Sequence, residues 1–275
     1  MHTVSANGAN IPALGFGTFR MPGDEIRSVL PKAIDLGFRH IDTAQIYGNE
    51  AEVGQVIAAS GVPRHEIFLT TKVWVDKFAA RDFSASVDES LRKLKTDHVD
   101  LLLLHWPQSD VPLAERMDSL NAVKTAGKVK HIGISNFNIA MMNEAASLSD
   151  APIATNQVEY HPYLDQSKLL EAARARGISL TAYYLMADGR VPKDPLLQDI
   201  AARHGKTAAQ VVLRWAVQQD GVIALSKTAT ESRLKENFDV FDFALSADEM
   251  QAIHALAKPD GRIVNPGHLR PPHWD

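Results

Sequence analysis

The sequence contains no cysteine among its 275 residues. Disulfide bridges and thiolate metal sites are therefore excluded. It also lacks any run of about 18 apolar residues, which a membrane-spanning helix would need. The N-terminal stretch MHTVSANGANIPALG has neither a basic region nor a long apolar core, so no secretory signal is expected there. These absences predict a cytoplasmic protein that has no membrane partner.

A surplus of positive charge is also missing. The formal net charge is −4, and charges of both signs are mixed along the chain. A general nucleic-acid binder needs a basic face, so no nucleic-acid partner is expected. No linker, low-complexity stretch or charge block divides the chain. We therefore expect residues 1–275 to form a single domain, which at this length can bury a sufficient core without disulfides.

Short apolar segments recur along the chain, and segments with helical periodicity separate them. The expected strands are LGFGT at 14, RHIDT at 39, FLTTKV at 68, VDLLLLH at 99, HIGIS at 131, ATNQVEY at 154, SLTAYY at 179 and GVIALS at 221. One helical segment, DFSASVDESLRKLK, places Phe83, Val87, Leu91 and Leu94 on one face. Strands that alternate with helices predict a parallel sheet.

Eight strands and about eight helices in a chain of this length predict a (β/α)8 TIM barrel. The interval before the eighth strand is the longest and is expected to hold an extra helix, with helices near 194–204 and 207–218. Asn7 and Gly8, between two short extended pieces, predict a β-hairpin that closes the bottom of the barrel. The alternative is an open doubly wound sheet with a G-x-G-x-x-G fingerprint. That alternative is weak, because GFGTFR has Arg20 where the third glycine belongs.

Polar side chains follow nearly every predicted strand, at the end of a barrel where active sites form. In chain order they are Asp42, Tyr47, Lys72, His105, Ser135, Asn136, Gln157, Tyr183, Ser226, Lys227 and Thr228. Lone charges after apolar strands are costly unless they are paired, so Asp42 and Lys72 are expected to form a cluster with His105. The histidines of the chain have no metal-ligand spacing, and no metal site is expected.

A tyrosine, a lysine, a carboxylate and a histidine at one barrel mouth can deliver a proton to a carbonyl oxygen. The lysine cation is expected to lower the pKa of the tyrosine, and the carboxylate to hold the lysine. No side chain here is redox active, so a cofactor must supply hydride. A Schiff-base lyase using Lys72 is an alternative, because a strand lysine can form an imine. Borohydride trapping with substrate would distinguish the two.

The sequence resembles the aldo-keto reductase family over essentially its full length. The motifs that carry the resemblance are GFGTFR, GFRHIDTAQIYGNEAEVG, TTKVW, LLLLHWP, KHIGISNF, NQVEYHP and the C-terminal NPGHLRPPHWD. The short tail resembles the bacterial branch that includes 2,5-diketo-D-gluconate and methylglyoxal reductases. The resemblance implies a monomeric enzyme that uses NADPH to reduce small aldehydes, ketoaldehydes or keto-sugar acids. A non-catalytic NADP-binding regulatory subunit is a further alternative, which turnover of NADPH with a small aldehyde would exclude.

The resemblance also implies roles for individual residues. The catalytic set is Asp42, Tyr47, Lys72 and His105. The residues expected to bind the nicotinamide end of the cofactor are Ser135, Asn136, Gln157 and the stacking Tyr183. Those expected around the 2′-phosphate and adenosine end are Ser226, Lys227, Thr228, Arg233, Glu236 and Asn237. The residues expected to line the substrate pocket are Phe19, Trp74 and Trp106.

Two segments depart from the family's pattern. In the atypical segment 183–189, YYLMADG, the turn that usually follows the stacking tyrosine and touches the cofactor pyrophosphate is replaced by Tyr184, Leu185 and Met186. This contact is therefore expected to come from backbone N–H groups. The usual Ile-Pro-Lys-Ser near the eighth strand is ALSKT, although Lys227 and Thr228 still align. Two cations and a hydroxyl at a helix start can form a phosphate site, so Lys227 and Arg233 are still expected to favour NADPH.

Overall fold

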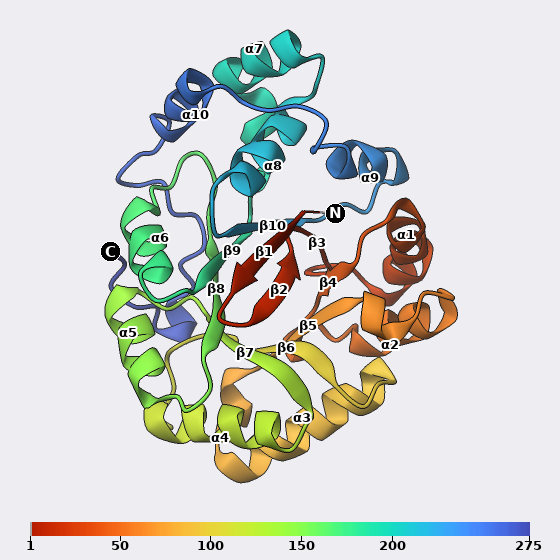
Figure 1. The fold of residues 1–275 in the computed structure, drawn as a ribbon, viewed down its shortest axis with the longest axis vertical. Helices are drawn as coiled ribbons and strands as arrows, with labels where there is room; N and C mark the ends of the chain where they lie inside the picture. The colour runs from red at the N-terminus through yellow and green to blue at the C-terminus, as the bar shows by residue number, and fades with distance from the viewer. Residues whose placement is uncertain (1) are drawn as a thin grey trace.

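The computed structural model describes residues 2–275, and in it eight parallel strands close into a barrel (Figure 1). Their order around the barrel is β10-β3-β4-β5-β6-β7-β8-β9. The strands are β3 (Leu14–Gly17), β4 (His40–Asp42), β5 (Phe68–Val73), β6 (Val99–Leu104), β7 (Val129–Ser135), β8 (Ile153–Glu159), β9 (Ser179–Tyr183) and β10 (Val222–Ser226). The predicted (β/α)8 barrel is confirmed, and the open doubly wound sheet is wrong.

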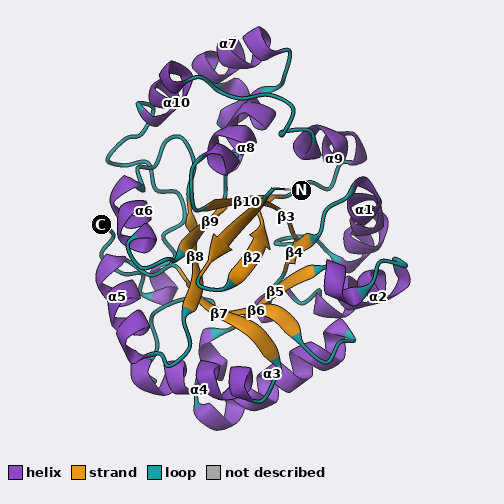
Figure 2. Ribbon diagram, viewed as in Figure 1, coloured by secondary structure: helices purple, strands orange, loops and turns teal. Residues whose placement is uncertain are grey.

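Helices form the layer outside the barrel (Figure 2). They are α1 (Gly23–Leu36), α2 (Glu50–Ala59), α3 (Ala80–Leu94), α4 (Leu113–Thr125), α5 (Ile139–Leu148), α6 (Ser167–Arg174), α7 (Pro195–His204), α8 (Ala208–Gln218), α9 (Glu231–Phe238) and α10 (Ala247–His254). The four apolar positions predicted to share one face of α3 are all buried. Every residue of β6 is buried as well, as expected for a parallel strand that packs on both faces.

The extra helix before the last strand is present, because both α7 and α8 lie between β9 and β10. Side chains set where these helices begin. Asp194 accepts hydrogen bonds from the first free amides of α7, and Thr207 forms a reciprocal capping box with Gln210 at the start of α8.

A β-hairpin closes one end of the barrel. It consists of β1 (Thr3–Ala6) and β2 (Ala9–Pro12), and Figure 1 shows it across the barrel opening. Asn7 and Gly8 both have positive φ, as a tight two-residue hairpin turn requires. Asn7 Nδ2 donates to the carbonyl oxygens of Ile153, at 2.7 Å, and Arg176, at 3.1 Å. Since Ile153 begins β8, the hairpin lies at the N-terminal end of the strands, as predicted.

A buried histidine lies in the barrel just below the mouth. His40, in β4, is 1% exposed, and its Nε2 lies 3.2 Å from Thr70 Oγ1. Burial lowers the pKa of His40 from 6.5 to about 4, although Asp42 opposes the shift. The folded protein therefore binds this proton less readily than the unfolded chain.

Acid is expected to destabilise the fold through His40. Because its pKa is lower in the folded state, the unfolded chain takes up the proton first as the pH falls. The free energy of unfolding should drop by about 3 kcal/mol as the pH falls from about 6.5 to about 4. Urea unfolding at several pH values measures this drop. The His40→Gln variant should show a shallower pH dependence over that interval, and an unchanged dependence would contradict the assignment.

Candidate active site

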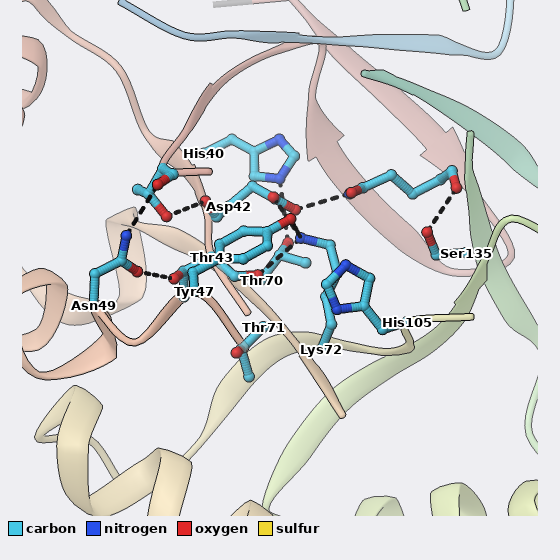
Figure 3. Close-up of polar contacts among 12 residues, drawn as sticks. His40, Asp42, Thr43, Tyr47, Asn49, Thr70, Thr71, Lys72, His105 and Ser135 are labelled. Carbon is cyan, nitrogen blue, oxygen red and sulfur yellow. Dashed lines mark hydrogen bonds and ion pairs between the residues drawn. The ribbon is translucent and has the colours of Figure 1, made fainter. Parts of the chain in front are cut away.

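Four ionisable side chains meet at the C-terminal end of the strands (Figure 3). Asp42 ends β4, Lys72 lies in β5, and His105 directly follows β6. Tyr47 ends the short helix η1 (Gln45–Tyr47), which lies in the loop after β4. Barrel closure thus brings together the four residues that the sequence predicts as one set.

Lys72 is the centre of this cluster. Its side chain is fully buried, and its Nζ donates to Asp42 Oδ1 at 2.6 Å and to the carbonyl oxygen of Thr43 at 2.8 Å. A third, longer contact of 3.4 Å joins Nζ to Tyr47 Oη. Burial lowers the pKa of the Lys72 ammonium, and the Asp42 carboxylate opposes this shift. The ion pair offsets the cost of keeping both charges away from water.

The environment of Tyr47 changes one expectation. The sequence predicts that Lys72 lowers the pKa of the phenol. In the structure, burial raises the pKa of Tyr47 well above its usual value, and the Asp42 carboxylate raises it further. Tyr47 therefore keeps its proton at neutral pH, as a proton donor must.

His105 is held as a neutral imidazole. Burial and then the charge of Lys72 lower the pKa of His105 well below its usual value. Its ring makes edge contacts with Tyr47 and Trp74, with centroids 5.6 and 5.1 Å apart. Within residues 2–275 its buried Nδ1 has no hydrogen-bond partner. This ring can hydrogen-bond a carbonyl oxygen placed beside the phenol without adding a second cation.

Four polar residues next to this cluster contact one another. Asn136 Nδ2 donates to the carbonyl oxygen of His105 at 3.0 Å, and Tyr183 Oη donates to Asn136 Oδ1 at 2.6 Å. Ser135 Oγ donates to the carbonyl oxygen of Gln157 at 2.8 Å. These are the four residues that the sequence predicts for the nicotinamide end of the cofactor, and they surround one side of the mouth.

Gln157 connects this group to the ion pair. Its Nε2 donates to Asp42 Oδ2 at 2.8 Å, so the two Asp42 oxygens are shared between Gln157 and Lys72. Sequence reasoning missed this contact, because the two residues are far apart in the chain and nothing in their spacing indicates it.

The predicted 2′-phosphate residues lie after β10 and in α9. Lys227 and Arg233 are exposed, and neither forms an ion pair with any residue from 2 to 275. Thr228 Oγ1 accepts from the amide of Thr230 just before α9, and the buried Ser226 Oγ has no partner in the described chain. An unpartnered hydroxyl at the end of β10, with unpaired cations just after it and in α9, fits a phosphate-bearing cofactor.

The other two residues predicted for that end lie deeper in α9. Glu236 accepts a hydrogen bond from Thr207 Oγ1, at the start of α8, at 2.7 Å. Asn237 is 8% exposed. Glu236 is thus hydrogen-bonded to another residue of the protein, and Asn237 is buried. Of the six residues predicted for this end of the cofactor, Lys227 and Arg233 are the ones whose side chains are most available to bind a phosphate.

The atypical segment 183–189 has a strained backbone. Tyr184, Ala187 and Asp188 all have positive φ, which non-glycine residues rarely adopt. Strain of this kind persists where the surrounding structure over-determines it, and it often marks a functional loop. The segment begins at Tyr183, the last residue of β9, and backbone contacts from it to a pyrophosphate stay a prediction.

The three predicted substrate-pocket aromatics differ in exposure. Phe19 is 43% exposed, and its ring centroid lies 5.0 Å from that of Tyr47. Trp74 is partly buried and lies against His105. Trp106 is only 6% exposed. Phe19 and Trp74 therefore flank the phenol and the imidazole, while Trp106 is mostly enclosed.

An asparagine that sequence reasoning missed organises the loops around Tyr47. Asn49 is 2% exposed, and its Nδ2 donates to the carbonyl oxygens of Thr18 and Met21. Its Oδ1 accepts from Thr43 Oγ1 at 2.8 Å. Asn49 thereby joins the loop that carries Phe19 to the loop that carries Tyr47. Its only signal in the sequence is its place just before α2, which by itself suggests a helix cap.

A closed parallel barrel with this buried cluster at its mouth defines a barrel enzyme with an acid–base site. Among residues 2–275 there is no group of three or more histidine or acidic side chains arranged to hold a metal ion. Over the same residues no helix is both long and apolar enough to cross a membrane.

The sequence profile of the Aldo/keto reductase family matches residues 13–258. The chain therefore belongs to the aldo-keto reductase family, as its motifs predict, and it is an NADP-dependent oxidoreductase that reduces carbonyl compounds.

Individual relatives agree with this assignment. The methylglyoxal reductase DkgB of Escherichia coli O157:H7 is 44% identical over 268 residues, which cover 96% of this chain and 99% of that protein. A crystal structure of a proposed 2,5-diketo-D-gluconic acid reductase B is 71% identical, with a TM-score of 0.99, and the match covers 100% of this chain and 98% of that one. A variant of Gox0644 in complex with NADPH is 35% identical, with a TM-score of 0.89 and 96% of each chain covered.

Proposed function

We propose that this protein reduces the carbonyl group of small aldehydes, ketoaldehydes or keto-sugar acids with NADPH, and that Tyr47 is the general acid. The observation that carries the proposal is the contact of 3.4 Å between Tyr47 Oη and the buried Lys72 ammonium, beside a neutral His105. The substrate classes are supported by the names of the relatives, which include methylglyoxal and 2,5-diketo-D-gluconic acid reductases.

The proposed mechanism assigns one task to each residue. When bound at this site, NADPH would be the source of the hydride that reduces the carbonyl carbon. Tyr47 donates its proton to the carbonyl oxygen as negative charge develops there, and His105 hydrogen-bonds the same oxygen and orients it. Lys72 lies where its charge stabilises the phenolate that Tyr47 becomes, and Asp42 holds Lys72 in place.

The residues around the mouth fit the cofactor. The Tyr183 ring and the amides of Asn136 and Gln157 would hold the nicotinamide, whose flat ring and carboxamide need a stacking surface and hydrogen-bond partners. Lys227 and Arg233 would hold the 2′-phosphate, since both are exposed cations without an ion pair in the described chain.

A panel of carbonyl compounds tests the function directly. Methylglyoxal, glyoxal, 2,5-diketo-D-gluconate and simple aldehydes would be compared by their rates of NADPH oxidation. Turnover of at least one of them is expected, and no turnover of any would favour a regulatory cofactor-binding subunit.

A Schiff-base lyase is less consistent with the site. Imine formation needs a neutral amine with access to substrate. The Lys72 side chain is fully buried, and three oxygen atoms surround its amine. Borohydride trapping with a carbonyl substrate should therefore give no covalent adduct on Lys72.

Arg233→Ala is expected to weaken NADPH binding selectively. A charge-assisted hydrogen bond contributes roughly 1.5–3 kcal/mol, so the dissociation constant of NADPH should rise by about tenfold to a hundredfold. The dissociation constant of NADH should hardly change, because NADH has no 2′-phosphate. Quenching of tryptophan fluorescence measures both constants, and the effect should shrink as salt is raised.

Lys235→Ala is the matched control, because Lys235 lies in the same helix and pairs with Asp239. It should leave both dissociation constants nearly unchanged. Equal affinity of the wild type for NADH and NADPH would refute the phosphate site.

A further inference from the structure

The C-terminal strap, defined here as residues 261–275, crosses the barrel's edge and ends beside α5 and α6 (Figure 1). It contains only one short helical turn, η6 (Gly267–Leu269). Its first residue approaches another backbone closely: a Cβ on Gly261 would lie 1.7 Å from the carbonyl oxygen of Tyr163. Only glycine fits at this contact, so the strap leaves the body of the protein along a defined path.

A fully buried carboxylate binds the start of the strap. Glu159, the last residue of β8, is 0% exposed. Its Oε1 accepts from the amide of Ile263 at 2.7 Å, and its Oε2 accepts from the amide of Val264 at 2.9 Å. Arg262 Nη1 lies 3.6 Å from Oε2, and His161 Nε2 lies 2.9 Å from Oε1. Three of these four partners belong to the strap.

These contacts keep Glu159 ionised. Burial by itself would raise its pKa, but the hydrogen bonds from His161 and from the two strap amides hold the pKa below its usual value. A buried carboxylate is costly unless it is paired, so Glu159 and the strap stabilise each other's position.

The far end of the strap is held at the start of α5. Asn138 Nδ2 donates to the carbonyl oxygen of His273 at 2.8 Å, and the amide of Ile139 donates to Asp275 Oδ2 at 2.7 Å. Within the strap, the Trp274 ring lies 3.6 Å from the guanidinium carbon of Arg262. The strap is therefore fastened to the end of β8 and to the start of α5, the helix that follows β7.

The residues that fasten the strap adjoin the proposed nicotinamide platform, defined as Asn136, Gln157 and Tyr183. Asn138 follows Asn136 by two positions, and Glu159 follows Gln157 by two positions. Glu159 also pairs in register with Tyr183 of β9. If the strap shifted, the segments around Asn138 and Glu159 that bind it would shift as well. The neighbouring platform residues would then move with them.

We propose that Glu159 is a positioning residue, whose carboxylate holds the C-terminal strap against the end of β8 and the start of α5 and thereby keeps the nicotinamide platform in its binding arrangement. The inference that Glu159 holds the strap needs only the contacts above. The inference that this keeps the nicotinamide platform in place rests on the proposed function.

Trypsin gives a readout at a single bond. Lys258 and Arg270 are each followed by proline, which trypsin does not cut, so Arg262–Ile263 is the one cleavable bond after Lys235. The Glu159→Gln variant keeps the size of the side chain and removes its charge. Loss of charge-assisted contacts should increase cleavage of this bond by about tenfold or more, as measured by the release of residues 263–275 in mass spectrometry.

The same variant should bind NADPH more weakly. A coupling of ordinary size between two sites changes affinity by about fivefold or more. By reciprocity, saturating NADPH should slow the cleavage at Arg262. Fluorescence titration and cleavage in the presence of NADPH measure the two effects, and neither depends on carbonyl turnover.

Two further variants make the test decisive. Glu249→Gln is the matched control, because Glu249 is a buried carboxylate of α10 that contacts His204, away from the strap. It should leave both readouts unchanged. Trp274→Ala leaves Glu159 intact and removes the ring over Arg262, so it should also increase cleavage, and it replaces Glu159→Gln if that variant does not fold.

Each outcome decides one part of the inference. Wild-type resistance to trypsin in the Glu159→Gln variant would overturn the role of Glu159. Faster cleavage with an unchanged NADPH dissociation constant would overturn the link to the platform. If the wild type binds no NADPH, the proposed function fails, and so does the inference that Glu159 keeps the nicotinamide platform in place. The cleavage comparison still decides whether Glu159 holds the strap.

Discussion

Tyr47→Phe is expected to lower the rate of carbonyl reduction by at least about 100-fold, the usual contribution of a general acid. The substitution keeps the ring that packs against Phe19 and His105 and removes only the hydroxyl. Because burial holds the pKa of Tyr47 well above its usual value, the wild-type enzyme should not lose this proton across the neutral pH range. Steady-state rates of NADPH oxidation at saturating carbonyl substrate measure the loss.

The affinity of the Tyr47→Phe enzyme for NADPH should stay close to that of the wild type, since the lost hydroxyl contacts Lys72 and not the platform residues. Tyr163→Phe is a matched control, because its hydroxyl contacts Asp194 at the start of α7. That variant should reduce carbonyls normally. Turnover of Tyr47→Phe at the wild-type rate would remove Tyr47 from the mechanism.

Lys72→Met is expected to abolish most of the activity and to destabilise the fold as well. The phenolate formed during proton transfer loses its neighbouring cation. Asp42 is left as a buried carboxylate whose remaining side-chain partner is Gln157. Breaking a buried ion pair in this way typically costs about 3–5 kcal/mol of folding free energy. Denaturant unfolding and NADPH oxidation measure the two effects separately.

The double variant Lys72→Met/Asp42→Asn separates chemistry from stability. Removal of the second charge should restore much of the folding free energy, because no unpaired buried charge remains. Activity should stay low, since the cation is still missing. Recovery of activity together with stability would show that Lys72 is needed only for folding.

The local pattern of apolar and polar residues in the sequence is sufficient to predict the barrel. Apolar segments such as residues 99–104 alternate with helical periodicity, and this alternation depends only on neighbouring residues. Turn chemistry is local too, so the dipeptide Asn7-Gly8 by itself indicates the hairpin. The strand ends in turn predict that Asp42, Lys72 and His105 lie at one mouth.

Contacts between distant segments could not be predicted in this way. The hydrogen bond from Gln157 to Asp42 and the bonds from Ile263 and Val264 to Glu159 each join residues more than one hundred positions apart. Motifs place Gln157 at a strand end, but they say nothing about which side chain it meets across the barrel. No spacing rule connects such pairs.

The sequence by itself determined the strand and helix rhythm, the hairpin turn and the set of polar residues at the strand ends, because these depend on periodicity and local backbone preference. Tertiary structure alone decided the direction in which the pKa of Tyr47 shifts and the hydrogen bond between Glu236 and Thr207. It also decided the attachment of the strap to Glu159. The physical reason is that desolvation and hydrogen-bond partners depend on which groups barrel closure brings within a few ångströms, and that information is distributed over the whole chain.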